Sequence, residues 1–234
     1  MSETITNSTP IKAVVFDMAG TTIDEGKTVY ECVRRTLEQF GLHYSLPEVM
    51  ERVGGMNKKE GIRLLMELKL GEVEKEKAEE AGEIFRTMVE EAYRNSEKIK
   101  EMPGASDLFS HLQQNNIKVV LDTGYIRSTA DLLIDKMGWR DKQLIDFSVT
   151  SDEVSQGRPA PQMIQRALEH FNIKSAGDIV KVGDTRSDME EGINAGCRYI
   201  VGMISTQYTK DDLLAMGATH AIHSLEELKA IIAA

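Results

Sequence analysis

Four short apolar runs, each followed by polar or glycine residues, constrain the fold of this chain more than any other feature. The first ends at Asp17, the second at Asp122 and Thr123, and the third just before Asp184. Apolar runs of this length, bounded by turn residues, are typical of buried strands in a parallel sheet. The four runs cover residues 12–16, 117–121, 179–182 and 199–202.

Segments of helical character separate these runs along the chain. They cover residues 104–115, 127–138, 161–171 and 187–195. Strands that alternate with helices predict an α/β fold with a doubly wound parallel sheet. In such sheets the functional site lies at the carboxyl ends of the strands. We therefore expect the polar residues that follow the strands to form the site.

The segment 27–101 interrupts this alternation. It contains no convincing strand and has the pattern of about four amphipathic helices, with apolar groups such as Leu64, Leu65 and Leu68. The sequence thus predicts two domains. Residues 1–26 and 102–234 would form the α/β core, and residues 27–101 an inserted helical cap.

Composition limits the partners that the chain can have. Its 234 residues include 28 Lys and Arg against 38 Asp and Glu, a net charge of −10. With no basic cluster, this balance argues against nucleic acid as the main partner, although it does not restrict what a single cleft binds. We expect no membrane span, because no apolar run approaches the ~20 residues that one needs. The N-terminal residues lack the pattern of a secretory signal, and Cys32 and Cys197 fit no metal or redox spacing, so a cytoplasmic setting is expected.

The residues at the predicted strand ends together describe a phosphoryl-transfer site. A carboxylate can attack phosphorus and form an aspartyl phosphate, which makes Asp17 the candidate nucleophile. Because the carboxylate and the phosphoryl group are both anions, a hard cation must lie between them. Asp184 would add a second carboxylate ligand for Mg²⁺. Further roles are assigned to Asp188 as support for the metal, to Thr123 and the amide of Gly124 as donors to phosphoryl oxygens, and to Arg158 as fixed positive charge. Each residue alone could be a helix cap, a turn residue or a surface charge, and their order on successive strands favours the site.

Four motifs resemble those of the haloacid dehalogenase (HAD) superfamily: FDMAGTT, LDTGY, GRPAP and VGDTRSDMEEGINAG. The resemblance extends from Lys12 to Gly202, with a helical cap where that superfamily often inserts one. It implies a HAD-like Rossmannoid core. It also implies particular roles: Asp17 as nucleophile; Asp17, Asp184 and the Ala19 carbonyl as Mg²⁺ ligands; Thr123 and Arg158 as phosphoryl ligands; and Asp188 as metal support.

Ala19 distinguishes this sequence from most phosphatases of the superfamily. HAD phosphatases usually carry a second aspartate two residues after the nucleophile, where it protonates the leaving group. Alanine cannot do so, and such acid–base catalysis is worth ~10²–10⁴-fold in rate. The motif around Ala19 is instead similar to the phosphonoacetaldehyde hydrolase family, which cleaves a carbon–phosphorus bond with the help of a cap lysine. The segment GGMNKKEGIR resembles that family's cap loop, and Lys58 falls on its Schiff-base lysine. Tyr125 is also retained, and the resemblance implies that it takes part in binding the substrate.

The presence of Lys58 suits that chemistry. A neutral lysine amine condenses with an aldehyde to an iminium, which accepts electrons when the carbon–phosphorus bond breaks. The amine must lose its proton near neutral pH, through desolvation or a neighbouring cation such as Lys59. Alone, Lys58 is more simply interpreted as a solvated lysine; together with Ala19, it favours the catalytic interpretation.

Three departures from the family pattern leave alternatives open. Gly61 replaces a usual histidine, Gly54 a frequent methionine, and Lys27 a frequent cysteine, so that a second amine could lie near the site. The chain could be a phosphonoacetaldehyde hydrolase with altered support, or a relative that acts on another compound. It could also be a HAD phosphatase or phosphomutase for a small phosphorylated metabolite, with Lys58 as a binding cation, or a non-enzymatic module. By resemblance, a homodimer through the cap is expected.

Overall fold

A six-stranded parallel sheet forms the centre of the computed structural model, which describes residues 10–54 and 56–233. The strand order is β5-β4-β1-β6-β7-β8. The strands are β1 (Ala13–Phe16), β4 (Lys118–Thr123), β5 (Phe147–Thr150), β6 (Ile179–Gly183), β7 (Tyr199–Met203) and β8 (His220–Ile222). The predicted doubly wound α/β fold is therefore confirmed, and the structure adds the two edge strands, β5 and β8, that the apolar runs did not predict.

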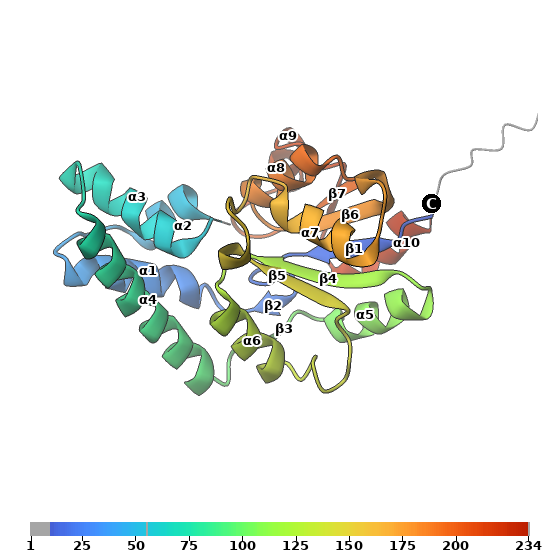
Figure 1. Ribbon diagram of the computed structural model, residues 1–234, viewed down its shortest axis with the longest axis horizontal. Helices are drawn as coiled ribbons and strands as arrows, with labels where there is room; N and C mark the ends of the chain where they lie inside the picture. Colours follow the sequence, from blue (N-terminus) through green and yellow to red (C-terminus); the bar gives the residue numbers. More distant parts are fainter. Residues whose placement is uncertain (1–9, 55, 234) are drawn as a thin grey trace, which may run out of the picture.

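Helices cover both faces of this sheet (Figure 1). One face carries α5 (Ala105–Gln114), α6 (Arg127–Lys136) and α10 (Leu228–Ile232), and the other α7 (Gln162–Phe171), α8 (Arg186–Ala195) and α9 (Lys210–Ala215). Successive side chains of a strand point to opposite faces. In β1, Val14 and Phe16 accordingly pack in one apolar cluster with Phe109, while Val15 packs in another with Ile164. Burial on both sides explains why these strands are continuously apolar.

Four helices lie together at one end of the sheet (Figure 1). They are α1 (Thr28–Gln39), α2 (Leu46–Val53), α3 (Lys58–Leu70) and α4 (Lys75–Asn95). The short strands β2 (Ile23–Asp24) and β3 (Lys100–Glu101) pair antiparallel where the chain enters and leaves this bundle. The division into domains stays a prediction, and its residues 1–9, 55 and 234 lie outside the described part.

The apolar grouping predicted for α3 is only partly right. Leu65 is fully buried, but Leu64 and Leu68 are 36% and 54% exposed. Ile62 and Met66 are the residues that join Leu65 in the interior. The buried face of α3 is therefore rotated from the one that the leucines suggested.

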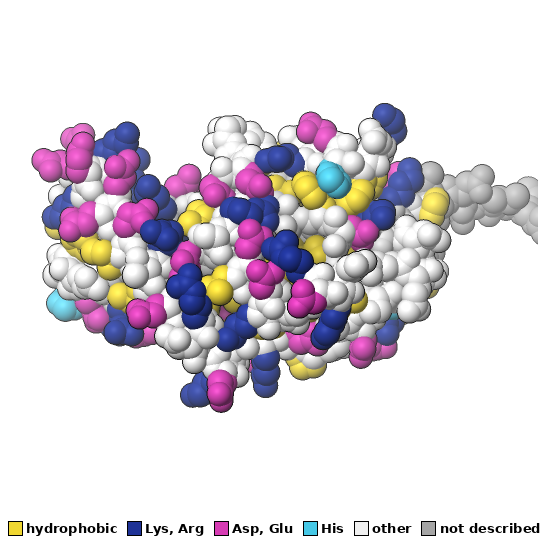
Figure 2. All heavy atoms as spheres, turned by 60° about the horizontal axis from the view of Figure 1, so that its bottom comes forward, with side chains coloured by type: hydrophobic (Ala, Val, Ile, Leu, Met, Phe, Trp, Pro, Cys, Tyr) yellow, Lys and Arg dark blue, Asp and Glu magenta, His cyan; other side chains and the backbone are white. Residues whose placement is uncertain are grey.

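The surface of the molecule is strongly charged. Acidic and basic side chains are interspersed on the face in Figure 2. Neighbouring turns of a helix can carry opposite charges, as in the ion pair between Arg86 and Glu83 of α4. Within the described residues, none of the helices combines the length and the apolar character that crossing a membrane requires.

Candidate active site

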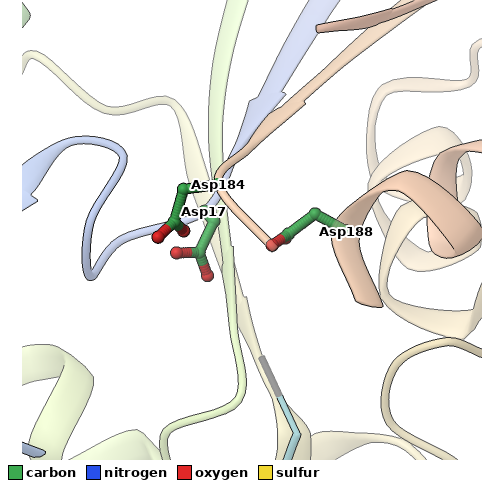
Figure 3. A group of neighbouring side chains, drawn as sticks. All are labelled: Asp17, Asp184 and Asp188. Atoms are coloured by element: carbon green, nitrogen blue, oxygen red, sulfur yellow. The ribbon is translucent and has the colours of Figure 1, made fainter. Parts of the chain in front are cut away.

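Three acidic side chains meet at the carboxyl ends of the central strands. Asp17 follows β1, Asp184 follows β6, and Asp188 lies in the first turn of α8. Since β1 and β6 pair in parallel, their ends emerge at the same edge of the sheet. Carboxylate oxygens of the three residues lie within 4.8 Å of one another. Figure 3 shows Asp17 beside Asp184, with Asp188 directed toward both.

Glycines make this close approach possible. Gly20 has φ +88°, and a Cβ there would lie 2.3 Å from Oδ2 of Asp184. A Cβ on Gly183 would lie 2.3 Å from the Cβ of Asp188. The hydroxyl of Thr21 donates a hydrogen bond of 3.3 Å to Asp184. Gly20 thus leaves room for the carboxylate of Asp184, and Gly183 for the side chain of Asp188.

Arg158 is buried and is surrounded by four acidic side chains. Its Nη1 lies 2.7 Å from Oδ1 of Asp17 and 2.8 Å from Oδ1 of Asp188. Its Nη2 lies 2.7 Å from Asp122, and its Nε lies 3.1 Å from Glu191. The guanidinium therefore orients the candidate nucleophile, and it also lines the cavity into which Asp17 opens. Its predicted role as a phosphoryl ligand stays a prediction.

Three charged residues beneath the site were missed by sequence reasoning. Lys181, on β6, is fully buried and lies 2.5 Å from Asp122 and 2.9 Å from Glu191. Burial opposes ionisation of Asp122, but the charges of Arg158 and Lys181 outweigh it and hold its pKa below the usual range. Burial raises the pKa of Glu191 well above its ordinary value. The signal available in the sequence was Lys181 itself, a single charge within an otherwise apolar strand.

The acidic groups at the site outnumber the buried cations. Burial, reinforced by the charge of Asp17, raises the pKa of Asp184 well above its usual value. The pKa of Asp17 is raised to about 6 by burial, against the effect of Arg158. A divalent cation beside both carboxylates would lower the two pKa values. Oxygen donors from Asp17 and Asp184, which lie close together, form the kind of ligand set that such a cation prefers, and Ala19 lines the same cavity as Asp17.

Asp188 has the surroundings of a supporting residue. One of its oxygens pairs with Arg158 at 2.8 Å, and the other accepts hydrogen bonds of 3.2 and 2.5 Å from the amide and hydroxyl of Thr185. Both oxygens are therefore engaged by the protein. This arrangement suits the predicted role of Asp188 in supporting the loop that carries Asp184, a predicted metal ligand.

The predicted phosphoryl-binding loop lies beside Asp17. Thr123, the last residue of β4, together with Gly124 and Tyr125, lines the same cavity as Asp17. The hydroxyl of Thr123 accepts a hydrogen bond of 3.2 Å from the amide of Tyr125, which closes the turn. The structure therefore brings all three predicted residues together, and their roles in binding stay predictions.

Lys58 reaches this cavity from the helical bundle. It is 7% exposed and contributes, with Asp17, Ala19 and Tyr30, to the wall of a small cavity of about 20 Å³. Its Nζ donates hydrogen bonds of 2.8 and 3.3 Å to the carbonyls of Met56 and Val53 and lies 5.2 Å from the centre of the Tyr30 ring. No ion pair joins it to a carboxylate within residues 10–54 and 56–233. Burial lowers its pKa to about 8, against the attraction of Asp17.

The three departures from the family pattern have different surroundings. A Cβ on Gly61 would lie 2.8 Å from the Cβ of Val53, so α2 and α3 leave no space there for a larger side chain. Gly54 packs closely on the Met50 carbonyl, near Tyr30. Lys27 is exposed, and its amine donates a hydrogen bond of 3.4 Å to Thr206. The expectation that Lys27 could add a second amine to the site is not met, since it does not contribute to the cavity around Asp17.

The sequence is similar to known proteins over most of its length. The profile of haloacid dehalogenase-like hydrolases matches residues 14–201. The chain is 32% identical to a bifunctional phosphonoacetaldehyde hydrolase/aminoethylphosphonate transaminase of Clostridioides difficile, over 80% of this chain but only 30% of that longer protein. It is 30% identical to the phosphonoacetaldehyde hydrolase of Bacillus cereus, over 83% of this chain and 76% of the relative.

The fold has a solved counterpart. The crystal structure of a phosphonoacetaldehyde hydrolase-like protein from Oleispira antarctica superposes with a TM-score of 0.82 at 22% identity, covering 97% of this chain and 92% of that one. Together with the sheet topology and the motif positions, these matches establish the family. The chain belongs to the haloacid dehalogenase-like hydrolases, is itself a hydrolase, and within that family is similar to the phosphonoacetaldehyde hydrolases.

Proposed function

We propose that this protein is a Mg²⁺-dependent hydrolase that cleaves the carbon–phosphorus bond of phosphonoacetaldehyde or a close analogue. The observation that carries the proposal is the position of Lys58, buried in the wall of the cavity that Asp17 and Ala19 also line. An amine with a pKa of about 8 is partly neutral at physiological pH and can attack an aldehyde. The same cavity holds a carboxylate that can attack phosphorus.

Asp17 is the nucleophile of this mechanism. Its Oδ1 is held 2.7 Å from Arg158, so that the carboxylate has a fixed orientation before substrate binds. Thr123 and Gly124 supply neutral donors for the phosphoryl oxygens. Bound by Asp17, Asp184 and the Ala19 carbonyl, Mg²⁺ would supply the positive charge that lets two anions approach.

Lys58 activates the leaving group. Its amine condenses with the substrate aldehyde, water leaves, and an iminium forms. When Asp17 attacks phosphorus, the electrons of the carbon–phosphorus bond move to the iminium and give an enamine. No alkoxide leaves in this step, and a general acid at Ala19 is not needed. Water then hydrolyses the aspartyl phosphate to inorganic phosphate.

One observation favours a second candidate, a phosphatase or phosphomutase for a small phosphorylated metabolite. The Nζ of Lys58 donates hydrogen bonds to two backbone carbonyls, an arrangement that also suits an ammonium ion. As a cation it would bind the substrate without forming a covalent bond. The leaving group would then need another proton donor, because Ala19 provides none.

A substrate panel separates the two candidates. Phosphonoacetaldehyde and a set of phosphate monoesters are assayed for phosphate release with and without Mg²⁺. Lys58→Arg should abolish turnover if an imine forms and preserve much of it if the lysine acts only as a cation. Lys59→Arg, at the exposed neighbouring lysine, is the matched control and should retain activity. Turnover of esters alone, with Lys58→Arg active, would refute carbon–phosphorus cleavage. A cytoplasmic setting and a homodimer through the helical bundle stay predictions.

A further inference from the structure

Three buried polar groups form a hydrogen-bonded chain that ends at the cavity. The hydroxyls of Tyr93, on α4, and Tyr125 lie 2.6 Å apart, and the Tyr93 hydroxyl donates a hydrogen bond of 3.2 Å to Oε2 of Glu25. Glu25 and Tyr125 are 6% and 5% exposed, and Tyr93 is fully buried. Tyr125 also contributes to the cavity wall beside Asp17 and Lys58. The chain thus connects a buried carboxyl group to the cavity where substrate would bind.

The direction of these hydrogen bonds depends on whether Glu25 carries a proton. With Glu25 ionised, Tyr93 donates to the carboxylate, and Tyr125 must then donate to Tyr93. With Glu25 protonated, the carboxyl can donate to Tyr93 and Tyr93 to Tyr125. The hydrogen of the Tyr125 hydroxyl is then free to point into the cavity. One proton on Glu25 therefore makes Tyr125 a proton donor at the site.

Burial shifts Glu25 toward its protonated form. Burial raises its pKa, against the hydrogen bond from the amide of Val29 and the charge of Lys58. Cys32 also lies within range of its charge, and burial raises the pKa of that thiol to about 11. Burial also raises the pKa of Tyr93 and of Tyr125 well above 10, so both remain protonated hydroxyls.

We propose that Glu25 and Tyr93 are positioning residues that deliver a proton through Tyr125 to the substrate carbon after the carbon–phosphorus bond has broken. The inference rests on the proposed function, in which that bond leaves an enamine. Tyr125 gives its proton to the enamine carbon, Tyr93 reprotonates Tyr125, and the carboxyl of Glu25 reprotonates Tyr93. The enamine becomes an iminium again, which water hydrolyses to the aldehyde and the free amine of Lys58. Glu25 regains its proton from water.

This relay would supply a proton donor that neither Ala19 nor Gly61 provides. Ala19 has no proton to give, and the close packing of Gly61 on Val53 leaves no room there for a side chain that could. Carbon is protonated slowly without a positioned acid, so a donor near the reacting carbon is worth ~10²-fold or more in rate. Tyr125 lines the cavity, and its hydroxyl connects through that of Tyr93 to the buried carboxyl group of Glu25.

The test follows two products separately in a single turnover of phosphonoacetaldehyde. Glu25→Gln keeps an oxygen that accepts from Val29 and Tyr93 but has no carboxyl proton, and Tyr93→Phe interrupts the chain. In both variants, transfer of phosphorus to Asp17 should continue while release of the aldehyde slows by ~10²-fold, with kcat/KM little changed. In D₂O, the aldehyde should gain its methyl deuteron at the same slowed rate.

Two controls distinguish a relay from a structural role. Tyr44→Phe removes another buried hydroxyl, which donates to the Leu65 carbonyl within the helical bundle. Glu90→Gln alters a buried acidic side chain on α4, which accepts a hydrogen bond from Ser128. Both should release phosphate and aldehyde together, as the unmodified protein does. Equal loss of both products in Glu25→Gln and Tyr93→Phe, or aldehyde release at the normal rate, would overturn the relay and leave the proposed function intact. Failure of the unmodified protein to cleave phosphonoacetaldehyde would overturn both.

Discussion

Arg158 holds Asp17 in place, with 2.7 Å between Nη1 of the guanidinium and Oδ1 of the carboxylate. The side chain of Arg158 is only 1% exposed, and its other nitrogens contact Asp122 and Glu191. The guanidinium therefore forms ion pairs both with the candidate nucleophile and with the buried carboxyl groups of Asp122 and Glu191. Stability and catalysis should depend on the same residue.

Arg158→Met should destabilise the protein severely. It would leave the buried carboxylates with Lys181 as their remaining buried partner, and breaking a buried ion pair from one side typically costs about 3–5 kcal/mol. Urea denaturation measures the loss. Arg140→Met is the control, because the Arg140 side chain is 56% exposed and its pairs with Asp131 and Asp135 should contribute only about 0–1 kcal/mol. An equal loss in the free energy of unfolding for the two substitutions would contradict the stabilising role of the ion pairs around Arg158.

Gly20→Ala should weaken metal binding. The new methyl group would lie 2.3 Å from Asp184 Oδ2 and would displace that carboxylate. We expect a higher Mg²⁺ concentration for half-maximal activity, read from a titration of the metal-free protein. Gly26→Ala is a matched control, since Gly26 also has a positive φ (+62°) but has nothing within 4 Å of its Cβ position. Loss of metal response in both variants would point to backbone strain rather than to Asp184.

Ala19→Asp should shift the reaction that the site favours. A carboxylic acid at this position could protonate an alkoxide, so hydrolysis of phosphate monoesters should rise, by up to ~10²-fold. The same carboxylate would stabilise the protonated amine of Lys58 across the cavity, so cleavage of phosphonoacetaldehyde should fall. Ala19→Asn has the same shape without the acid and should not raise ester hydrolysis. A gain with Asn equal to that with Asp would exclude proton transfer as the cause.

Activity should rise with pH through about 8. The pKa of Lys58 is lowered from 10.5 to about 8, because its burial disfavours the charged amine. Attack on the aldehyde requires the neutral form, so kcat/KM should increase as pH approaches that value and flatten above it. A profile of kcat/KM for phosphonoacetaldehyde against pH measures this. A rise that continues to pH 10 would mean that the essential lysine is not desolvated.

The buried strands could be predicted from the sequence, and the edge strands could not. The runs that became β1, β4, β6 and β7 lie between two layers of helices, so nearly every side chain is apolar. At the edges, β5 has a pairing partner only in β4, and β8 only in β7. Their half-buried segments FSVT and HAI therefore show no continuous apolar pattern.

The site was predictable as far as short motifs define it. Asp17, Thr123 and Asp184 each follow or end a predicted strand, and the parallel sheet brings them to one edge. Asp188 lies in the first turn of the helix that follows Asp184. The buried chain beside them was not predictable. Glu25 and Tyr93 are 68 positions apart in the sequence, and neither belongs to a motif. They meet because α4 packs against α1 and because β3, which follows α4, pairs with β2, which precedes Glu25.

The most direct test of the account is covalent trapping at Lys58. Borohydride is added to the protein during turnover of phosphonoacetaldehyde, and peptide mass spectrometry locates the reduced adduct. The account predicts an added two-carbon group on Lys58, loss of activity in proportion to labelling, and neither effect in Lys58→Arg. Normal turnover with no adduct at Lys58 would contradict it.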